Sequence, residues 1–350
     1  MTELELLGPY AFGVPSAKAI LKATPADFQV EEQLDIALSG EGEHLWLWVE
    51  KQGLNTEEVA IQLSKRAKLP VRAISYAGLK DRQAITRQWF SLHLPGRQDP
   101  DFTTAETEQW KVLHTIRHHR KLQRGAHKSN TFVICLQDFQ GNPQQLEERL
   151  NSIKQQGVPN YYGTQRFGRE GFNLLKAQEF AEQKILPDKR HVRSRLLSSA
   201  RSFLFNQVLA LRVRQGIWNQ IVAGDLIGFS GSHSFFPASE LQANDPRFTA
   251  LDIHPTLMLW GKGHLATTAL AHQLETAIAI QNQPICAWLE NAGLEQERRI
   301  SRLVVSDLRY ELHEHHIQLA FSLPVGSFAT VVLRELVQLE TINEGLLCAY

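Results

Sequence analysis

The sequence is poor in cysteine and contains no long apolar run. Its three cysteines, Cys135, Cys286 and Cys348, are widely spaced and form no CxxC pair, which argues against a disulfide framework and against a zinc site. No stretch reaches the roughly 18 apolar residues that indicate a membrane-spanning helix. The first 20 residues contain Glu3 and Glu5 and no apolar core, so we expect no secretory signal. These absences predict a cytoplasmic protein without a membrane segment.

Motifs for nucleotide and metal chemistry are also missing. The chain has no P-loop, no GxGxxG after a strand, no HExxH pair and no GxSxG elbow, so cofactor sites of these kinds have no support. The pairs His118-His119 and His315-His316 have no cysteine partner at ligand spacing, which a zinc site would need. We therefore expect neither a metal nor a cofactor.

Charge is balanced in total but uneven along the chain. The 37 Lys and Arg residues match the 37 Asp and Glu residues, whereas nucleic-acid binders are usually basic. From Lys111 to Gln137, however, there is no acidic residue, and from Lys184 to Arg201 there is only Asp188. Two local basic patches suit a polyanion held along a groove. The alternative is that both are ordinary solvated loops or helix faces.

Hydrophobic patterning predicts strands at both ends of the chain and a helical middle. Alternation indicates strands at 28–30, 44–49, 90–94, 130–136 and 317–321, and spacings of three and four indicate helices at 55–67, 146–153, 203–211, 266–280 and 329–339, the last capped by Ser327. The glycine-rich segment 157–168 is the best candidate for a domain boundary. We expect a domain built from residues 1–155 and 304–350, with a second domain of residues 156–303 inserted between them.

One segment places an acidic residue in a glycine turn among cations. In Gly78-Leu79-Lys80-Asp81-Arg82, the glycine permits a close approach of other groups, and the neighbouring positive charges would keep the aspartate ionised, as a nucleophile or a base requires. The alternative is a charged surface turn.

Aromatic residues next to polar ones form two further candidates. Asn130 and Phe132 follow the first basic window, and such a pair could hold an unstacked base by ring stacking and an amide contact. Tyr161, Gln165 and Arg166 lie among glycines in a loop, where they suit RNA contact. The alternatives are that Phe132 is a core residue of a strand and that the loop packs a domain junction.

Five segments together resemble the TruD family of tRNA pseudouridine synthases. They are Asp27-Phe28-Gln29-Val30-Glu31-Glu32, Gly78-Leu79-Lys80-Asp81-Arg82, Asn130-Thr131-Phe132, residues 160–168, and Gly326-Ser327-Phe328-Ala329-Thr330 with Leu333-Arg334-Glu335. They occur in the family's order and span nearly the whole chain. One departure is Pro-Thr-Leu-Met-Leu-Trp-Gly at 255–261, where the family commonly has Gly-Pro-Leu-Trp-Gly.

The resemblance implies an α+β fold: a catalytic domain with a central mixed, largely antiparallel sheet flanked by helices, plus an inserted, mainly helical α/β domain. It implies isomerisation of uridine, at position 13 of certain tRNAs, to pseudouridine, with Asp81 as the catalytic carboxylate. Substrate-binding residues would be Phe28, Asn130, Phe132, Phe328 and Lys80, and RNA-binding residues would be Lys22, Arg120, Lys121, Arg124, Gln165 and Arg166. The implied partner is tRNA, and we expect a monomer with no protein partner.

The chemistry agrees with the residues that are present and absent. The reaction cleaves the N1–C1′ bond, turns the base and rejoins it through C5, which needs a carboxylate but no redox partner, metal or nucleotide. Two alternatives stay open. An RNA-binding protein or RNA chaperone of the same fold would use the same basic and aromatic residues without catalysis. A glycosidase acting on free carbohydrate would need a second catalytic acid paired with Asp81, and the sequence offers none that can be named.

Overall fold

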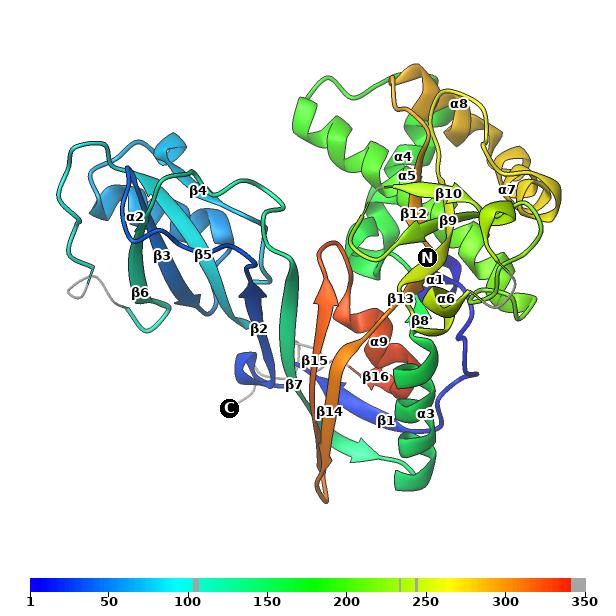
Figure 1. Cartoon of the computed structure of the whole chain (residues 1–350), viewed down its shortest axis with the longest axis horizontal. Coiled ribbons are helices and arrows are strands. Elements are labelled where there is room, and N and C mark those ends of the chain that lie inside the picture. Colours follow the sequence, from blue (N-terminus) through cyan, green and yellow to red (C-terminus); the bar gives the residue numbers. More distant parts are fainter. Residues whose placement is uncertain (103–106, 233, 243–244, 341–350) are drawn as a thin grey trace. The chain divides into compact units, whose positions relative to one another are not determined.

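The chain folds into two compact units, seen here in a computed structural model that describes residues 1–102, 107–232, 234–242 and 245–340 (Figure 1). The helical unit comprises Met1–Pro15, Glu147–Val305 and Ser327–Leu336. The sheet unit comprises Ser16–Leu146, Ser306–Gly326 and Val337–Tyr350. The domain limits expected from the sequence (1–155, 156–303 and 304–350) stay a prediction.

The sheet unit is built on a mixed sheet of ten strands in the described part of the chain. These are β1 (Lys18–Leu21), β2 (Phe28–Gln33), β3 (His44–Lys51), β4 (Ile74–Tyr76), β5 (Ile85–His93), β6 (Trp110–His118), β7 (Ser129–Gln140), β14 (Ser306–Leu312), β15 (His316–Pro324) and β16 (Gln338–Glu340). The main order is β14-β15-β7-β2-β5-β3-β6, with β4 on β5, and with β1 joining β7 to β16 (Figure 1). Only β2–β5 and β1–β16 pair in parallel among these strands, which confirms a mixed, largely antiparallel sheet.

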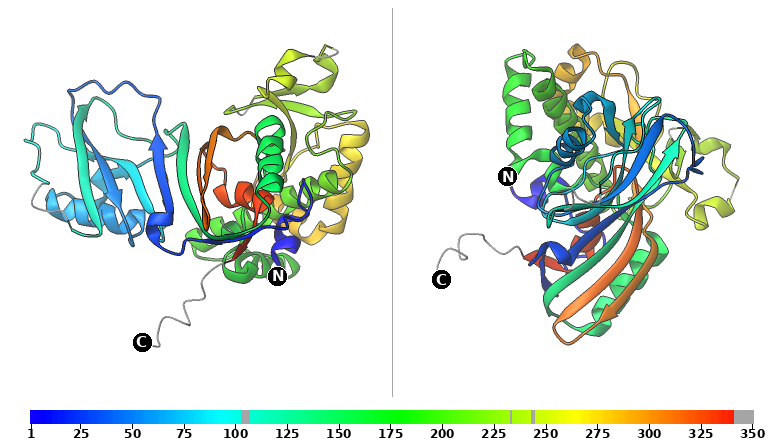
Figure 2. Two further views of the ribbon diagram at one scale, coloured as in Figure 1. Left: turned by 90° about the horizontal axis from the view of Figure 1, so that it is seen from below. Right: turned by 90° about the vertical axis from the view of Figure 1, so that its left-hand side faces the viewer.

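One helix covers the part of this sheet that leads to the candidate site. Helix α2 (Thr56–Arg66) is capped by Asn55, whose side chain forms a capping box with Glu58. Its buried residues Val59 and Leu63 pack with apolar side chains of β3 and β5 in one core. The ribbon views in Figure 2 show the helix, in blue, beside these strands. Because the helical stripe and the strand alternation face each other, this contact fixes α2 on the sheet.

The helical unit combines helices with short strands, as expected for the insertion. Its helices are α1 (Glu3–Leu7), α3 (Pro143–Gln156, which begins in the sheet unit), α4 (Phe172–Glu182), α5 (Arg190–Arg214), α6 (Pro246–Thr249), α7 (Ala269–Gln281), α8 (Gln283–Asn291) and α9 (Ala329–Leu336), and its strands are β8 (Val158–Pro159), β9 (Leu226–Phe229), β10 (Phe235–Pro237), β11 (Ile253–Leu259), β12 (Glu297–Ile300) and β13 (Arg302–Leu303). The long helix α5 buries Phe203, Leu204 and Val208 in the core of this unit.

The last helix is shorter than its pattern predicts. Helix α9 ends at Leu336, and residues 338–340 form β16 instead of a further helical turn. The reason is tertiary pairing: β16 runs parallel to β1, and the Gln338 amide donates a hydrogen bond to the Ala17 carbonyl. Local periodicity does not show this strand, because the partner lies more than 300 residues away.

Three observations concern the described residues as a set. Cys135 and Cys286 are free, and Cys348 lies outside the described part of the chain. Within that part, no group of three or more His, Cys, Asp or Glu side chains is placed to hold a metal ion. None of the helices described combines the length and the apolar character that crossing a membrane requires.

Candidate active site

Asp81 lies in the loop that joins the antiparallel neighbours β4 and β5. The loop, residues 77–84, begins after Tyr76, which pairs with Phe90 of β5. A Cβ atom at Gly78 would lie 3.1 Å from Cε1 of His127, so the glycine leaves room for the close approach of this ring.

Buried hydrogen bonds hold this loop on the sheet unit. The Lys80 amide donates to Oγ1 of Thr56 (2.9 Å), and Nε2 of Gln88 donates to the Gly78 carbonyl (3.0 Å). Thr56 Oγ1 in turn donates to Oε1 of Gln88 at 2.9 Å. Because Thr56 and Gln88 are fully buried, the loop is fixed from below by side chains whose own positions are set by packing.

The Asp81 carboxylate is half-buried and accepts bonds at both oxygens. Oδ2 accepts a hydrogen bond from the Lys22 ammonium, and Oδ1 accepts one from the Gln83 amide at 3.0 Å. Burial by itself raises the pKa of Asp81, but the Lys22 ammonium and the Gln83 amide outweigh it, so the pKa lies below its usual value. The group is therefore ionised at neutral pH while 31% of its side chain stays exposed.

A second lysine lies beneath the same loop. Lys51, at the end of β3, is 1% exposed, and its Nζ donates a 2.6 Å hydrogen bond to the Asp81 carbonyl oxygen. Burial lowers the pKa of Lys51 to about 8, against the opposing charge of Asp81. Its charge also helps to lower the pKa of Asp81.

The cations beside Asp81 are thus not the ones adjacent to it in sequence, and the expectation that its flanking cations serve it is wrong. Lys80 instead forms a buried ion pair with Glu32 (2.8 Å), and Nε of Arg82 donates to the Gly53 carbonyl (2.9 Å). Adjacent residues of this loop thus take different partners, and sequence adjacency to Asp81 does not bring a cation to its carboxylate. The role of Lys80 in substrate binding stays a prediction.

Aromatic rings from three strands meet next to the Lys22–Asp81 pair. The Lys22 ammonium lies 4.3 Å from the ring centroid of Phe28. Phe28 packs edge-on against Phe132 (6.0 Å between centroids), which stacks on Phe321 (5.5 Å). Sheet register causes this, since Phe132 on β7 is paired with Val30 of β2 and with Phe321 of β15. The structure therefore brings together Phe28 and Phe132, although both rings are largely buried.

Asn130 carries an unused polar atom on β7. Its Oδ1 is buried and has no hydrogen-bond partner among the described residues. A buried amide oxygen without a partner is costly. A ligand N–H at this position would satisfy it, which fits the expected contact between Asn130 and a base.

Phe328, Gln165 and Arg166 belong to the helical unit, where Arg166 approaches Phe328. Phe328 is half-buried before α9 and packs edge-on against Tyr162 (6.2 Å between centroids), with Cζ of Arg166 5.9 Å from its ring. Nη1 of Arg166 donates to Oγ of Ser198 at 3.1 Å, and Gln165 is exposed.

The first basic window contains both paired and unpaired cations. Lys111 pairs with Glu50 (3.0 Å), Lys128 pairs with Asp35 (2.9 Å), and Arg117 pairs with Asp99. The predicted RNA contacts Arg120, Lys121 and Arg124 form no salt bridge within the described chain, and all three are exposed. They are therefore available to an anion, and their contact with RNA stays a prediction.

Sequence reasoning missed Lys51 and the Lys80–Glu32–His127 group. Strand alternation did contain a signal for the first, because Lys51 shares the parity of the buried Leu47 and Val49. Glu32 is fully buried, accepts from the Trp89 amide (3.0 Å) and lies 3.7 Å from Nδ1 of His127. No local pattern predicts that group, since its members come from three distant segments.

Comparison with known proteins places the chain in a family. The family described as tRNA pseudouridine synthase D (TruD) matches residues 7–176 and 174–336. The chain belongs to the tRNA pseudouridine synthase D family. It is 58% identical to the tRNA pseudouridine synthase D of Pseudomonas putida (strain W619) over 340 residues, 97% of each chain. It is 54% identical to that of Pseudomonas fluorescens (strain Pf0-1) over 345 residues, 98% of each.

A solved structure supports the fold. The crystal structure of a Methanosarcina mazei protein, provisionally named tRNA pseudouridine synthase D, matches with a TM-score of 0.71. The match covers 95% of this chain and 96% of the Methanosarcina mazei chain, at 19% sequence identity. The α+β fold expected from the sequence is therefore confirmed.

Other TruD-like segments have structural roles in the helical unit. Glu335 is fully buried and accepts hydrogen bonds from the amides of Ala11 (3.0 Å) and Phe12 (3.3 Å). Arg334 donates to Glu3 (2.9 Å) and to the Gly8 carbonyl (3.0 Å). This part of the C-terminal motif anchors the N-terminal segment.

Proposed function

We propose that this protein isomerises uridine in tRNA to pseudouridine, at position 13, with Asp81 as the catalytic carboxylate. Membership of the tRNA pseudouridine synthase D family supports the reaction. The observation that carries the assignment of Asp81 is its ionised, half-buried carboxylate, held by Lys22 and the Gln83 amide beside aromatic side chains. A group fixed in this way loses little entropy when the substrate binds.

The reaction needs one negative group at the ribose and a holder for the base. The N1–C1′ bond breaks, the C5–C1′ bond forms, C5 loses its proton and N1 gains one. Asp81 acts either as a nucleophile at C1′ or as a base. Flipping a uridine out of RNA costs a few kcal/mol, roughly, and aromatic stacking offsets part of it. Within the sheet unit, we assign that contact to Phe28 and Phe132, and we assign to Asn130 Oδ1 a hydrogen bond from the base. The expected contact of Phe328 with the substrate stays a prediction.

The test uses the purified full-length chain and an unmodified tRNA transcript labelled with tritium at C5 of uridine. Rejoining at C5 releases the tritium. Asp81→Asn keeps the size of the side chain and removes its charge, so tritium release should vanish while tRNA binding and the circular dichroism spectrum persist. The matched control is Asp35→Asn, an exposed carboxylate paired with Lys128, which should retain activity.

The result also separates an enzyme from an RNA-binding protein without catalysis. Turnover that survives Asp81→Asn would remove Asp81 from the mechanism, and no turnover by the wild type on any tRNA would favour the RNA chaperone. Sequencing for pseudouridine in total RNA, with and without the protein, identifies the modified position.

We also propose that the protein acts as a monomer in the cytoplasm. Support comes from membership of a tRNA-modifying enzyme family and from the self-contained core of each unit. Light scattering of the purified chain, which has a mass of 39.7 kDa, checks the first point, and cell fractionation checks the second.

A further inference from the structure

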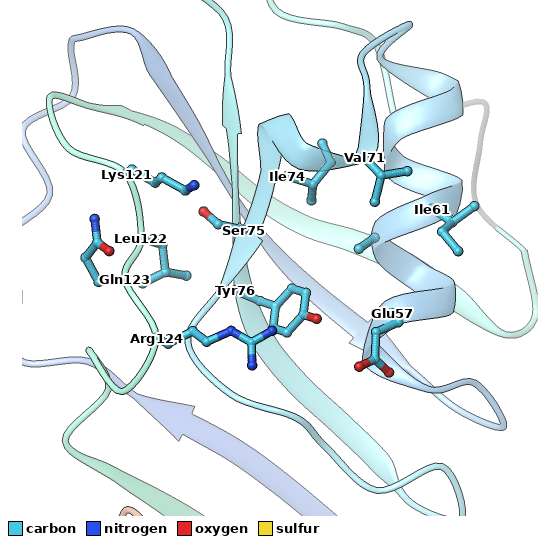
Figure 3. Close-up of a pocket in the computed structure, with 11 residues that line it drawn as sticks. Glu57, Ile61, Val71, Ile74, Ser75, Tyr76, Lys121, Leu122, Gln123 and Arg124 are labelled. Atoms are coloured by element: carbon cyan, nitrogen blue, oxygen red, sulfur yellow. The ribbon is translucent and has the colours of Figure 1, made fainter. Parts of the chain in front are cut away.

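A hollow of about 470 Å³ lies in the sheet unit between α2, β4 and residues 121–124 (Figure 3). Its volume is within the usual range of small-ligand sites, about 300–1,000 Å³. No residue of this hollow takes part in the Lys22–Asp81 pair or in the cluster around Phe28.

The floor of the hollow is an aromatic ring with a fixed orientation. Tyr76, the last residue of β4, packs edge-on against Phe90 of β5, with 5.9 Å between centroids. Cζ of Arg124 lies 5.4 Å from the Tyr76 ring. Figure 3 shows this ring between Arg124 on one side and Glu57 on the other.

Charged groups in the hollow are not neutralised by one another. Lys121, Arg124 and Glu57 are exposed and form no salt bridge to any residue that the structure describes. Glu57 and Arg124 nevertheless both act on Tyr76: burial raises the pKa of the phenol, Glu57 adds to the rise and Arg124 opposes it. The two opposite charges therefore flank one ring without closing on each other.

Apolar side chains complete the wall. Ile61 of α2 is 41% exposed and Val71 is 49% exposed. Both line the hollow, so a flat ligand on Tyr76 would cover apolar surface that now faces water.

We propose that this hollow binds a second nucleotide of the RNA substrate, whose base carries an amino group and stacks on Tyr76. This inference rests on the proposed function, because it takes RNA as the substrate. Arg124, unrestrained by a carboxylate, covers the base, and Lys121 binds a flanking phosphate. Glu57 accepts hydrogen bonds from the amino group. Uracil fits less well, because its N3–H lies between two carbonyl oxygens that a carboxylate repels.

The hollow is linked to the catalytic loop through the backbone. Tyr76 immediately precedes that loop, and the Gly125 amide donates a 2.8 Å hydrogen bond to the Ala77 carbonyl. A nucleotide held here is therefore held at a fixed position relative to Asp81, which would help to place the tRNA. Its loss should weaken binding more than it slows the bound complex.

The first experiment is a double-mutant cycle on tRNA binding, measured by filter retention with the full-length chain. Tyr76→Ala and Arg124→Ala should each weaken binding by about five- to 100-fold, the range expected for one stacked base. The double variant should lose less than the product of the two, because both side chains contact one base. Tyr76→Phe should bind like the wild type.

The matched control pairs Tyr76→Ala with Lys111→Ala, a cation of the same window that does not line the hollow. The fold-losses of tRNA affinity caused by Tyr76→Ala and Lys111→Ala should multiply in the double variant. If the Tyr76 and Arg124 effects also multiply, or if neither variant weakens binding, the proposal is overturned. Should Tyr76→Ala fail to fold, Glu57→Gln with Arg124→Ala forms the cycle, since both residues are exposed.

The second experiment titrates the chain with CMP, GMP, AMP, UMP and ribose 5-phosphate, observing the methyl NMR signals of Ile61 and Val71. CMP, GMP and AMP should shift these signals more strongly than UMP. In Glu57→Gln, the difference in shift between these three nucleotides and UMP should be smaller than in the wild type. Equal shifts with ribose 5-phosphate would show a phosphate site that reads no base. Nucleotide binding with unchanged tRNA affinity in all variants would show a mononucleotide site and overturn the RNA assignment. Neither readout needs turnover, so a failure of the proposed function remains distinguishable.

Discussion

Replacing Lys22 by methionine tests whether the lysine on the Asp81 carboxylate sets its charge state. The substitution keeps an unbranched side chain, one atom shorter, and removes the ammonium from the carboxylate and from the Phe28 ring. Three influences on the pKa of Asp81 then remain: burial raises this pKa, whereas the Gln83 amide and Lys51 lower it. Since an opposite charge in contact lowers a carboxyl pKa by about one to three pH units, its removal should raise that pKa by a similar amount.

The assay is the single-turnover rate of pseudouridine formation from pH 3 to 8.5, a range that begins below the usual aspartate pKa of 3.8. The acid limb of the Lys22→Met profile should move upward by about one to three pH units, so the variant loses most activity at acid pH and least near pH 8. Lys22→Arg keeps a positive charge and should keep the acid limb close to that of the wild type.

The free energy of unfolding should depend on pH in the same direction as the activity. A carboxylate whose folded pKa is lowered stabilises the fold above its unfolded pKa, near 3.8, and loses this contribution as the pH falls through the folded value. The stability advantage of the wild type over Lys22→Met in urea unfolding should therefore be full at pH 7 and shrink toward pH 3. An acid limb that does not move in Lys22→Met would refute the reasoning and leave Lys22 as an RNA contact.

Three further changes test the rest of the site. Lys51→Met removes a buried ammonium whose pKa in the folded protein, about 8, lies below its ordinary value of 10.5. The free energy of unfolding of the wild type, measured in urea, should therefore rise relative to that of this variant between pH 8 and 10.5. A difference in unfolding free energy that stays constant over this range would contradict the assigned pKa. Phe328→Ala should cost less than the roughly 3–5 kcal/mol of a fully buried ring, because Phe328 is half-exposed, yet it should slow turnover of the folded fraction; thermal melts beside single-turnover rates decide. Arg120→Ala with Lys121→Ala should reduce the slope of log tRNA affinity against log salt concentration by the amount expected for about two lost phosphate contacts. An unchanged slope would mean that these side chains point away from RNA.

Much of the sheet was predictable because its strands are amphipathic over their own length. Phe28 and Val30, or Ile317 and Leu319, face the core by simple alternation, and the structure has strands at both places. Alternation cannot say which strand lies beside which. The strand at 338–340 was missed for that reason, since it exists only through its pairing with β1.

For the site, the sequence by itself determined where the carboxylate sits: Asp81 follows a short strand and a glycine that permits close packing, and these are local properties. Only the tertiary structure decided which groups surround it. The adjacent Lys80 pairs with Glu32, while Lys22 and Lys51, each at least 30 residues away, take the places beside Asp81. The physical reason is that neighbouring side chains of a loop need not share a partner, whereas sheet register brings distant ones together.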